Sequence, residues 1–317
     1  MKYPKVSIVV LNWNNRKLIK DCLDSLYKLT DYPNYRVVLV ENGSTEENAD
    51  FSMKRYGKKA DVIIIKNNVG FCGGMNEGIK HAVKKHYPDY ILLLSNDTKI
   101  IHKKWLIKLV ETAESDEKIG IVGCKLIYPD GSLQIIGIKG NTRMYDKGEL
   151  KKINKKDEKI ANKVQEVKYV IGAVFLIKKE LIEKIGLLDP KFYPVYGEEI
   201  DYCERARKNG FKIFYTPKST VIHLRSQTTD PKKITKDWFF SKKNSIRLEL
   251  LNYAIPEILY WQIVHFGAIF LSKKKGKVFF RRNFPKRFLF LLKAYWINIK
   301  DIKEILYKRG HRNEKIW

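Results

Sequence analysis

The stretch YILLLSNDTKI, residues 90–100, decides how this chain folds. Its apolar run is typical of a strand buried on both faces, and it leads directly into Ser95, Asn96, Asp97 and Thr98. A lone carboxylate at the end of a buried strand is costly unless it is paired or bound to a metal ion. The pattern therefore predicts a polar site at the edge of a sheet, with Asp97 in it.

Similar apolar runs precede this stretch and alternate with segments of helical periodicity. The expected strands and helices are VSIVVLNW (6–13), LIKDCLDSLYKL (18–29), YRVVLVENGS (35–44), ADVIIIKN (60–67) and GFCGGMNEGIKHAVKKH (70–86). Strands that lack polar alternation and are separated by helices predict an α/β fold, with a mostly parallel sheet covered on both faces. Ligands of such sheets bind beyond the carboxyl ends of the strands. The loops that begin at Asn12, Glu41, Asn67 and Ser95 should therefore face one crevice.

The chain is strongly basic, and the excess of cations is concentrated toward its end. The formal net charge is +27 over 317 residues, and residues 231–317 hold 21 Lys and Arg against six Asp and Glu. Such a charge predicts an anionic partner, which is a phosphate-bearing ligand, nucleic acid or an acidic membrane surface. The tail has no finger, RRM or helix-turn-helix pattern, and its many Phe and Leu residues fit lipid better, so we expect no nucleic acid.

Two segments of the tail predict amphipathic helices. Residues 255–271 are mostly apolar but contain Glu257, Gln262 and His265, which makes the run short and polar for a membrane-spanning helix. Residues 277–300 mix Arg and Lys with Phe, Leu, Tyr and Trp, as in a helix that lies in the headgroup layer of an anionic membrane. A helical cap on the core and a dimer face are the alternatives, so the oligomeric state stays open.

The cysteines and the N-terminus favour a cytoplasmic protein. Cys22, Cys72, Cys124 and Cys203 form no CxxC motif and have no histidine at metal-finger spacing, which predicts reduced, buried thiols. The N-terminal apolar run is too short for a signal peptide, and no small-residue cleavage site follows it.

Further acids and one histidine lie at the ends of expected elements. Glu198, Glu199 and Asp201 stand together at the start of a helix, and His223 follows an apolar strand. One Asp and one His, together with phosphate oxygens, can hold Mg²⁺ or Mn²⁺, and a separate carboxylate facing them can act as a general base. The alternatives are that the helix macrodipole favours acids at this position and that the histidine is structural.

Seven motifs occur in an order that resembles a known family. They are VSIVVLNWNN, VVLVENGS, NVGFCGGMNEGI, LLLSNDT, VIGAVFLIKKELIEKIGLLDPKFY, YGEEIDYCERARKNGF and VIHLRSQT. Together they resemble the family-2 inverting glycosyltransferases of the GT-A fold, and in particular their rhamnosyltransferase-like branch, over roughly residues 4–250. The resemblance implies a catalytic domain over residues 1–234, with a nucleotide-sugar half to about 120 and an acceptor half at 121–234. Residues 235–317 form the basic helical extension.

The resemblance also assigns residues to the sugar-nucleotide donor. Trp13 would stack on the base, Glu41 would accept a hydrogen bond from it, and Arg225 and Lys218 would contact phosphate. The full set that the resemblance places on the donor is Asn12, Trp13, Glu41, Asn68, Gly70, Gly74, Asn76, Ser95, Asn96, Asp97 and Arg225.

The catalytic roles follow from the same resemblance. Asp97 stands where the family has the last acid of its Asp-x-Asp motif, with Ser95 in place of the first, and would hold Mn²⁺ or Mg²⁺ together with His223. Glu199 takes the position of the catalytic base, with Glu198 as its rival and Asp201 in support. Gly172 and Ala173 fall on the acceptor side.

The implied reaction is a metal-assisted single displacement that inverts the anomeric carbon. The donor would be a dTDP- or UDP-sugar, with rhamnose favoured, and the acceptor a lipid-linked or cell-surface glycan at the inner face of the cell membrane, where the protein is peripheral. The alternative is a relative that keeps the fold and binds nucleotide-sugars without turnover, and the substituted positions Ser95, Glu41 and Glu199 are its support.

Overall fold

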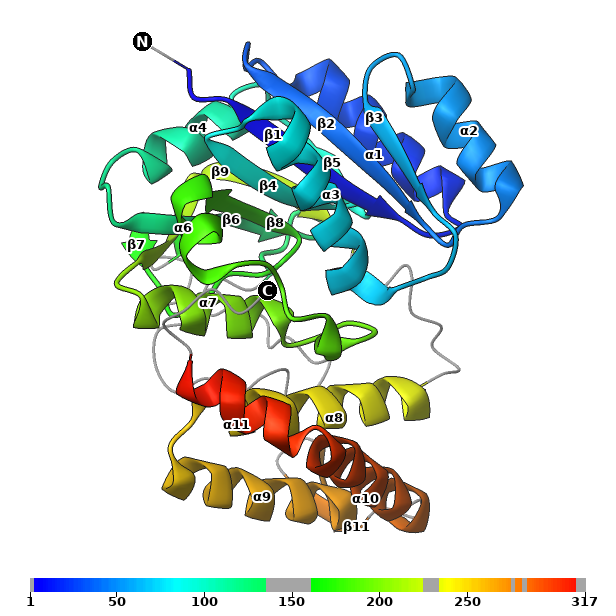
Figure 1. The fold of residues 1–317 in the computed structure, drawn as a ribbon, viewed down its shortest axis with the longest axis vertical. Coiled ribbons are helices and arrows are strands. Elements are labelled where there is room, and N and C mark those ends of the chain that lie inside the picture. Colours follow the sequence, from blue (N-terminus) through cyan, green and yellow to red (C-terminus); the bar gives the residue numbers. More distant parts are fainter. Residues whose placement is uncertain (1–2, 135–160, 225–233, 275–276, 281–283, 312–317) are drawn as a thin grey trace.

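The structure is a computed structural model, and it describes residues 3–134, 161–224, 234–274, 277–280 and 284–311. Strands and helices alternate in its first part, as the sequence predicts (Figure 1). They are β1 (Val6–Asn12), α1 (Arg16–Leu29), β2 (Tyr35–Asn42), α2 (Glu46–Tyr56), β3 (Asp61–Ile65), α3 (Gly70–His86) and β4 (Tyr90–Ser95).

The second part of the chain completes the same sheet. Its elements are β5 (Thr98–Ile100), α4 (Trp105–Ala113), β6 (Ile119–Ile127), β7 (Gln165–Glu166), β8 (Val174–Lys178), α6 (Lys179–Ile185), the 3₁₀ helix η1 (Pro190–Phe192), α7 (Glu198–Lys208) and β9 (Lys212–His223). The strand order is β3-β2-β1-β4-β8-β6-β9-β5, and β7 pairs with β9. Strands β3, β2, β1 and β4 run parallel, whereas β8 and β5 each pair antiparallel with their neighbours.

Strand β9 is long and continuous, but it has one irregularity. Its pairing with β6 slips between Thr216 and Thr220, which face Cys124 and Lys125. The irregularity falls at Pro217, because proline has no N–H to donate to a neighbouring strand.

Both faces of the sheet are buried, which explains the unbroken apolar strands. Val6, Ile8 and Val10 of β1 pack into the core under α1 and α4, while Val9 packs into the opposite core under α3. A period of two residues sends alternate side chains to opposite faces, so a strand covered on both sides must be apolar throughout. The mixed, mostly parallel α/β sheet of the prediction is confirmed.

The C-terminal region is helical, also as predicted. It contains α8 (Ile234–Asn252), α9 (Ile255–Phe270), the hairpin strands β10 (Leu271–Lys274) and β11 (Lys277–Phe280), α10 (Phe284–Lys300) and α11 (Ile302–Gly310). The first four residues of the helix expected at 277–300 are instead β11, which pairs antiparallel with β10. Pro285 then stands in the first turn of α10, where its missing N–H costs no intrahelical bond.

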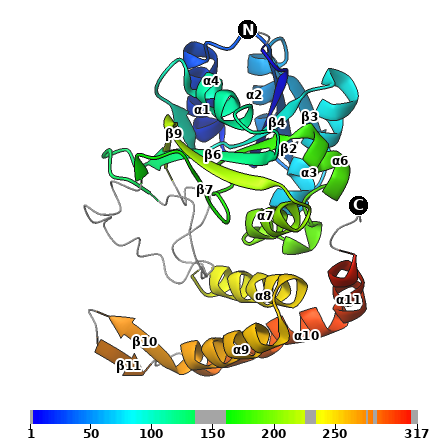
Figure 2. The same ribbon diagram turned by 90° about the vertical axis from the view of Figure 1, so that its left-hand side faces the viewer.

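The helical extension forms two layers below the sheet (Figure 2). Leu248 and Leu251 of α8 and Ile305 of α11 belong to the same hydrophobic core as α7. A smaller core joins α8 to α9 and α10, which lie farthest from the sheet. None of the described helices has the length and hydrophobicity needed to cross a membrane.

Candidate active site

The carboxylate that opens the sequence analysis lies beside His223. Asp97 is almost fully buried between β4 and β5, and β9 brings His223 opposite Thr98 in an antiparallel pair. His223 Nε2 lies 3.3 Å from Asp97 Oδ1, which also accepts a hydrogen bond from the hydroxyl of Ser95. Burial raises the pKa of Asp97, but the hydrogen bond and charge of His223 and the Ser95 hydroxyl outweigh it and hold the pKa below its ordinary value.

A glutamine that the sequence analysis did not single out fixes the ring of His223. Gln134 Nε2 donates to the backbone oxygen of His223 at 2.5 Å, so Gln134 Oε1 faces His223 Nδ1, at 2.9 Å. Because Oε1 can only accept, Nδ1 carries a hydrogen, and Nε2 is the ring nitrogen that faces Asp97. An imidazole nitrogen and a carboxylate oxygen that converge at 3.3 Å are both metal-ligand types, so these residues fit a divalent metal ion that takes the place of the hydrogen between them.

A buried chain of polar side chains runs from this acid into the first strands. Asn96 Nδ2 donates to Asn12 Oδ1 at 2.9 Å, and Asn12 Nδ2 lies 3.0 and 3.1 Å from the two oxygens of Glu41. Glu41 is fully buried, and its oxygens also accept from Ser44 and Ser52. In this arrangement the Glu41 carboxylate orients Asn12.

The expected donor residue Trp13 follows Asn12 at the edge of the sheet. Its side chain is 48% exposed and is therefore accessible to a ligand. Arg225 lies outside the described residues, and Lys218 lies exposed on β9.

The start of α3 is shaped by tight packing at two glycines. Gly70 has φ +77°, and a Cβ there would lie 2.6 Å from Cδ2 of Tyr193. A Cβ on Gly74 would lie 2.4 Å from a side-chain carbon of Leu11. Both contacts are too close for any larger residue, so the glycines set how near the helix comes to β1 and to the 190–197 loop.

The two asparagines of this segment bind backbone groups. Asn68 Oδ1 accepts from Gly70 N at 2.9 Å and from Asn42 Nδ2 at 3.2 Å. Asn76 is nearly buried and forms two hydrogen bonds with the backbone of Leu188, at 2.9 and 3.1 Å. Each amide thus holds a loop at the rim of the crevice.

Three acids begin α7, and they differ in their surroundings. Burial and the charge of Glu199 raise the pKa of Glu198 well above its ordinary value, and the buried Oε2 of Glu198 has no hydrogen-bond partner among the described residues. Asp201 is fully buried, forms an ion pair with Arg205 at 3.1 Å and accepts from Asn252 Nδ2 at 3.0 Å. Asp201 therefore ties α7 to the end of α8.

Residues 172 and 173 connect the two groups of acids. The backbone oxygen of Ala173 accepts from Ser95 N at 2.9 Å, directly beside Asp97. A Cβ on Gly172 would lie 3.8 Å from Cβ of Glu199. The Asp97–His223 pair and Glu199 therefore flank one short segment, although they are far apart in the sequence.

Helix α8 holds the loop that leads into these acids, which the sequence did not reveal. Asn244 Nδ2 lies 2.9, 2.9 and 3.0 Å from the backbone oxygens of Phe192, Val195 and Tyr196. Lys243 Nζ donates to the backbone oxygens of residues 191 and 193. The loop at 190–197 is therefore fixed by side chains from the C-terminal extension.

A buried ion network anchors the same loop at its first residue. Asp189, which is fully buried, pairs with Arg247 of α8 at 2.7 Å and with Lys308 of α11 at 3.2 Å. Glu304 of α11 completes the network, at 2.9 Å from Arg247. Removing one partner of such a network strands a buried charge, so α8 and α11 are firmly tied to the loop that leads into α7.

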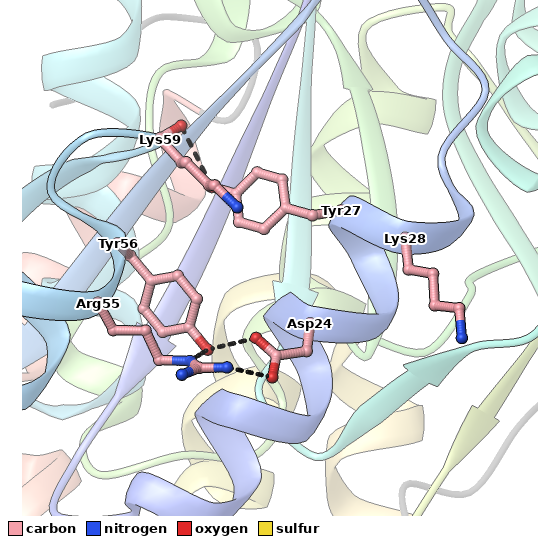
Figure 3. A pocket seen from close by; sticks show the side chains of 6 residues that line it. All are labelled: Asp24, Tyr27, Lys28, Arg55, Tyr56 and Lys59. Carbon is pink, nitrogen blue, oxygen red and sulfur yellow. Dashed lines mark hydrogen bonds and ion pairs between the residues drawn. The ribbon is translucent and has the colours of Figure 1, made fainter.

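A separate hollow lies between α1 and α2 (Figure 3). Its principal charged groups already satisfy each other, since Arg55 pairs with Asp24 at 2.6 Å and the hydroxyl of Tyr56 donates to Asp24 at 3.0 Å. The candidate site therefore remains at the carboxyl ends of the strands.

The protein is thus an α/β protein with a mixed sheet, an Asp–His pair at the carboxyl edge of its strands and a group of acids at the start of α7. The sequence matches the family described as "Glycosyltransferase like family 2" over residues 4–247, and the chain belongs to that family.

Two relatives and one solved structure show the range of similar proteins. The O-antigen biosynthesis protein RfbC of Myxococcus xanthus is 27% identical over 231 residues, which are 70% of this chain and 17% of the relative. An N-acetylglucosaminyl-diphospho-decaprenol L-rhamnosyltransferase of Mycobacterium tuberculosis is 21% identical over 244 residues, 70% of this chain and 76% of the relative. The structure of the mannosyltransferase PcManGT from Pyrobaculum calidifontis, in complex with GDP-Man and Mn²⁺, is similar with a TM-score of 0.57 at 15% identity. The similarity covers 97% of this chain and 82% of the mannosyltransferase chain. The chain thus spans about a sixth of the length of the first relative, and the likeness to the mannosyltransferase shows the fold.

Proposed function

We propose that this protein is an inverting glycosyltransferase that moves a sugar from a nucleoside-diphosphate donor to a hydroxyl group. The observation that carries the proposal is that both the strand end bearing Asp97 and the side chain of Glu199 lie next to residues 172–173. A glycosyl transfer by single displacement needs this arrangement, with charge stabilisation at the leaving group and a base at the attacking hydroxyl.

The donor side would be built around Asp97. Asp97 and His223 would hold Mn²⁺ or Mg²⁺, and Gln134 would keep His223 in the tautomer that binds metal. When bound, the ion acts as a Lewis acid that offsets the negative charge of the departing diphosphate. Asn12 and Asn96, oriented by Glu41, would line the nucleotide beside the exposed ring of Trp13.

The acceptor side would be built around Glu199. The resemblance assigns the role of base to Glu199, and the short distance from Gly172 to its side chain supports that assignment, with Glu198 as the rival. Glu199 removes the proton from the acceptor hydroxyl as its oxygen attacks the anomeric carbon, and Gly172 leaves room beside the carboxylate for the incoming group. Attack from the face opposite the leaving group inverts the configuration.

The outer helices support docking to an anionic membrane. On α9 two polar residues turn inward, since His265 Nε2 and Gln262 Nε2 bind Glu249 of α8 at 2.8 and 2.9 Å, whereas Glu257 in the first turn is exposed. Large apolar side chains face outward instead, with Ile263 73% exposed and Leu259 60% exposed.

Helix α10 continues this surface with an apolar stripe and a row of cations. Its exposed apolar residues are Phe284, Phe288, Leu289, Leu292, Trp296 and Ile299, and the exposed lysines of the same helix are Lys286, Lys293 and Lys300. Apolar residues together with cations suit insertion among anionic headgroups. We infer a peripheral protein at the cytoplasmic face of the cell membrane, where a lipid-linked or cell-surface glycan would be the acceptor.

The sugar follows from the motifs and from the relatives. Rhamnose carried on dTDP is the first candidate, because the motifs resemble the rhamnosyltransferase branch and one relative is a rhamnosyltransferase. UDP-sugars are the second. The other function to be weighed is nucleotide-sugar binding without turnover, which Ser95 favours by replacing the first metal-binding acid.

A donor panel tests the proposal. The full chain is incubated with dTDP-rhamnose and a set of UDP-sugars in the presence of Mn²⁺ or Mg²⁺, and release of nucleoside diphosphate is measured beside the thermal shift. We expect one donor both to raise the melting temperature and to be turned over, with Asp97→Asn losing the metal-dependent release. A thermal shift without release, with acceptor lipid extract present, would support the binding protein instead.

A further inference from the structure

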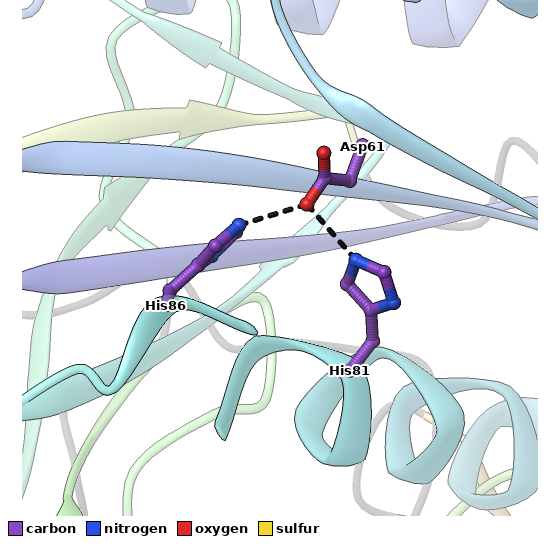
Figure 4. A group of neighbouring side chains, drawn as sticks. All are labelled: Asp61, His81 and His86. Carbon is purple, nitrogen blue, oxygen red and sulfur yellow. Dashed lines mark hydrogen bonds and ion pairs between the residues drawn. The ribbon is translucent and has the colours of Figure 1, made fainter. Parts of the chain in front are cut away.

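A second group of metal-binding side chains lies at the opposite end of α3 from the active site. The helix begins at Gly70 beside the acids of the site and ends at His86. His81 and His86 point toward Asp61, the first residue of β3 (Figure 4). One ligand atom from each of the three side chains lies within 4.8 Å of the other two.

Hydrogen bonds already orient these side chains toward one point. Asp61 Oδ2 lies 2.9 Å from His81 Nε2 and 2.8 Å from His86 Nε2. The hydroxyl of Ser7 lies 3.0 Å from the other ring nitrogen of His86, and Lys85 Nζ donates to Asp61 Oδ1 at 2.7 Å. Metal-binding histidines are commonly fixed in this way, with one ring nitrogen toward the ion and the other on an outer partner.

We propose that Asp61, His81 and His86 form a binding site for Zn²⁺ or a similar divalent transition-metal ion. Two imidazoles and one carboxylate are an established type of open zinc ligand set, which leaves a fourth position for water. Zinc bonds of about 2.0–2.2 Å in a tetrahedron separate neighbouring ligands by about 3.3 Å, so the Asp61–His81 and Asp61–His86 distances of 2.9 and 2.8 Å need to lengthen only slightly on binding.

Binding requires each ring to present the lone pair of Nε2. The hydrogen now on Nε2 must therefore move to Nδ1. At His86 the Ser7 hydroxyl then accepts that hydrogen instead of donating its own, because a hydroxyl can do either. No other group has to change its partner, since Lys85 stays on the second oxygen of Asp61.

The site differs in chemistry and in place from the proposed Mn²⁺ or Mg²⁺ site at Asp97. Imidazole nitrogen suits zinc, whereas magnesium and manganese favour oxygen ligands. An ion here would tie the last turns of α3 to the start of β3, which makes it structural. The ammonium of Lys85 opposes a cation at this position, so removing its charge is expected to strengthen binding.

Titration of the full chain with Zn²⁺ against a chromophoric chelator tests the proposal, with Co²⁺ as a spectroscopic substitute. We expect one zinc per chain besides any at Asp97, a rise of a few degrees in melting temperature, and visible Co²⁺ bands of a four-coordinate site. His81→Ala and the shape-conserving His81→Gln should each weaken zinc binding at least about 100-fold, since even loss of an outer partner costs 10- to 100-fold. Lys85→Met should strengthen it several-fold.

Two controls separate this site from other metal-binding groups. His311→Ala removes a partly exposed histidine far from α3 in the sequence and should leave zinc affinity unchanged, and Asp97→Asn should do the same. Unchanged zinc affinity in folded His81→Ala and His86→Ala would overturn the proposal. A full chain that binds zinc only through Asp97 would overturn the proposed zinc site as well. That result would leave the proposal of glycosyl transfer unaffected.

Discussion

The contact between Asn244 and the 190–197 loop offers the sharpest test of how the C-terminal helices act on the active site. The amide of Asn244 has two hydrogens, and they are shared among the backbone oxygens of Phe192, Val195 and Tyr196. Asn244→Ala removes the donor that these buried and partly buried oxygens share, and each hydrogen bond lost at such a position costs about 1–3 kcal/mol. We expect the free energy of unfolding to fall by about 2–4 kcal/mol.

The same substitution should lower the rate of the reaction more than it lowers the affinity for the donor. The loop leads directly into Glu198 and Glu199, and a displacement of about 1 Å in a reacting group can cost roughly 100-fold in rate. Asn244→Ala is therefore expected to lower kcat by about 10- to 100-fold, with the Kd for the donor nearly unchanged. Steady-state kinetics and isothermal titration measure the two quantities below the melting temperature of the variant.

The neighbouring residue supplies a matched control. Ser245 is also buried on α8, but its hydroxyl donates to Ser241 O within the same helix. Ser245→Ala should cost at most about 1 kcal/mol and leave kcat unchanged. If Asn244→Ala is folded and has the kcat of the unmodified protein, the loop does not need α8, and the reasoning is wrong.

Three further predictions follow from single features. Burial and the charge of a neighbouring arginine lower the pKa of Lys243 from 10.5 to about 8. Between these two pH values the folded state binds fewer protons than the unfolded state, so the free energy of unfolding should rise with pH. Denaturant unfolding should show this rise relative to Lys243→Met, and it should amount to about 1 kcal/mol at pH 9. Gly70→Ala should destabilise the protein by more than Gly131→Ala, because both glycines have positive φ but only a Cβ at Gly70 would collide with the ring of Tyr193. Equal melting temperatures of the two variants would contradict this. Replacing the exposed residues Ile263 and Trp296 together by Ser should reduce sedimentation with anionic vesicles and leave the melting temperature unchanged, whereas unaltered sedimentation would argue against this surface as the membrane contact.

The sheet could be predicted from the sequence because its physical cause is local. Runs such as residues 6–11 and 90–94 lack polar alternation, and only burial on both faces accounts for that. Asp97 could be placed at the edge of the sheet for the same reason, since it ends one of these runs. A buried strand must cross the sheet from one edge to the other, so the residue that follows it lies at an edge of the sheet.

The parts that could not be predicted depend on contacts between distant residues. Gln134 reaches His223 across 89 positions, and Lys308 reaches Asp189 across 119. Neither pair has a local pattern, because the partners meet only after the sheet and the C-terminal helices are in place. For this reason the sequence predicts residues 235–317 as a separate basic extension, whereas in the structure α8 and α11 share the hydrophobic core of α7.

The most direct test of the whole account is the release of nucleoside diphosphate by Glu199→Gln with the donor that the panel identifies. We expect a loss of several orders of magnitude in kcat with donor affinity retained, while Glu198→Gln keeps most of the rate. A Glu199→Gln variant that turns over like the unmodified protein would contradict the account, because no base would then act beside Gly172.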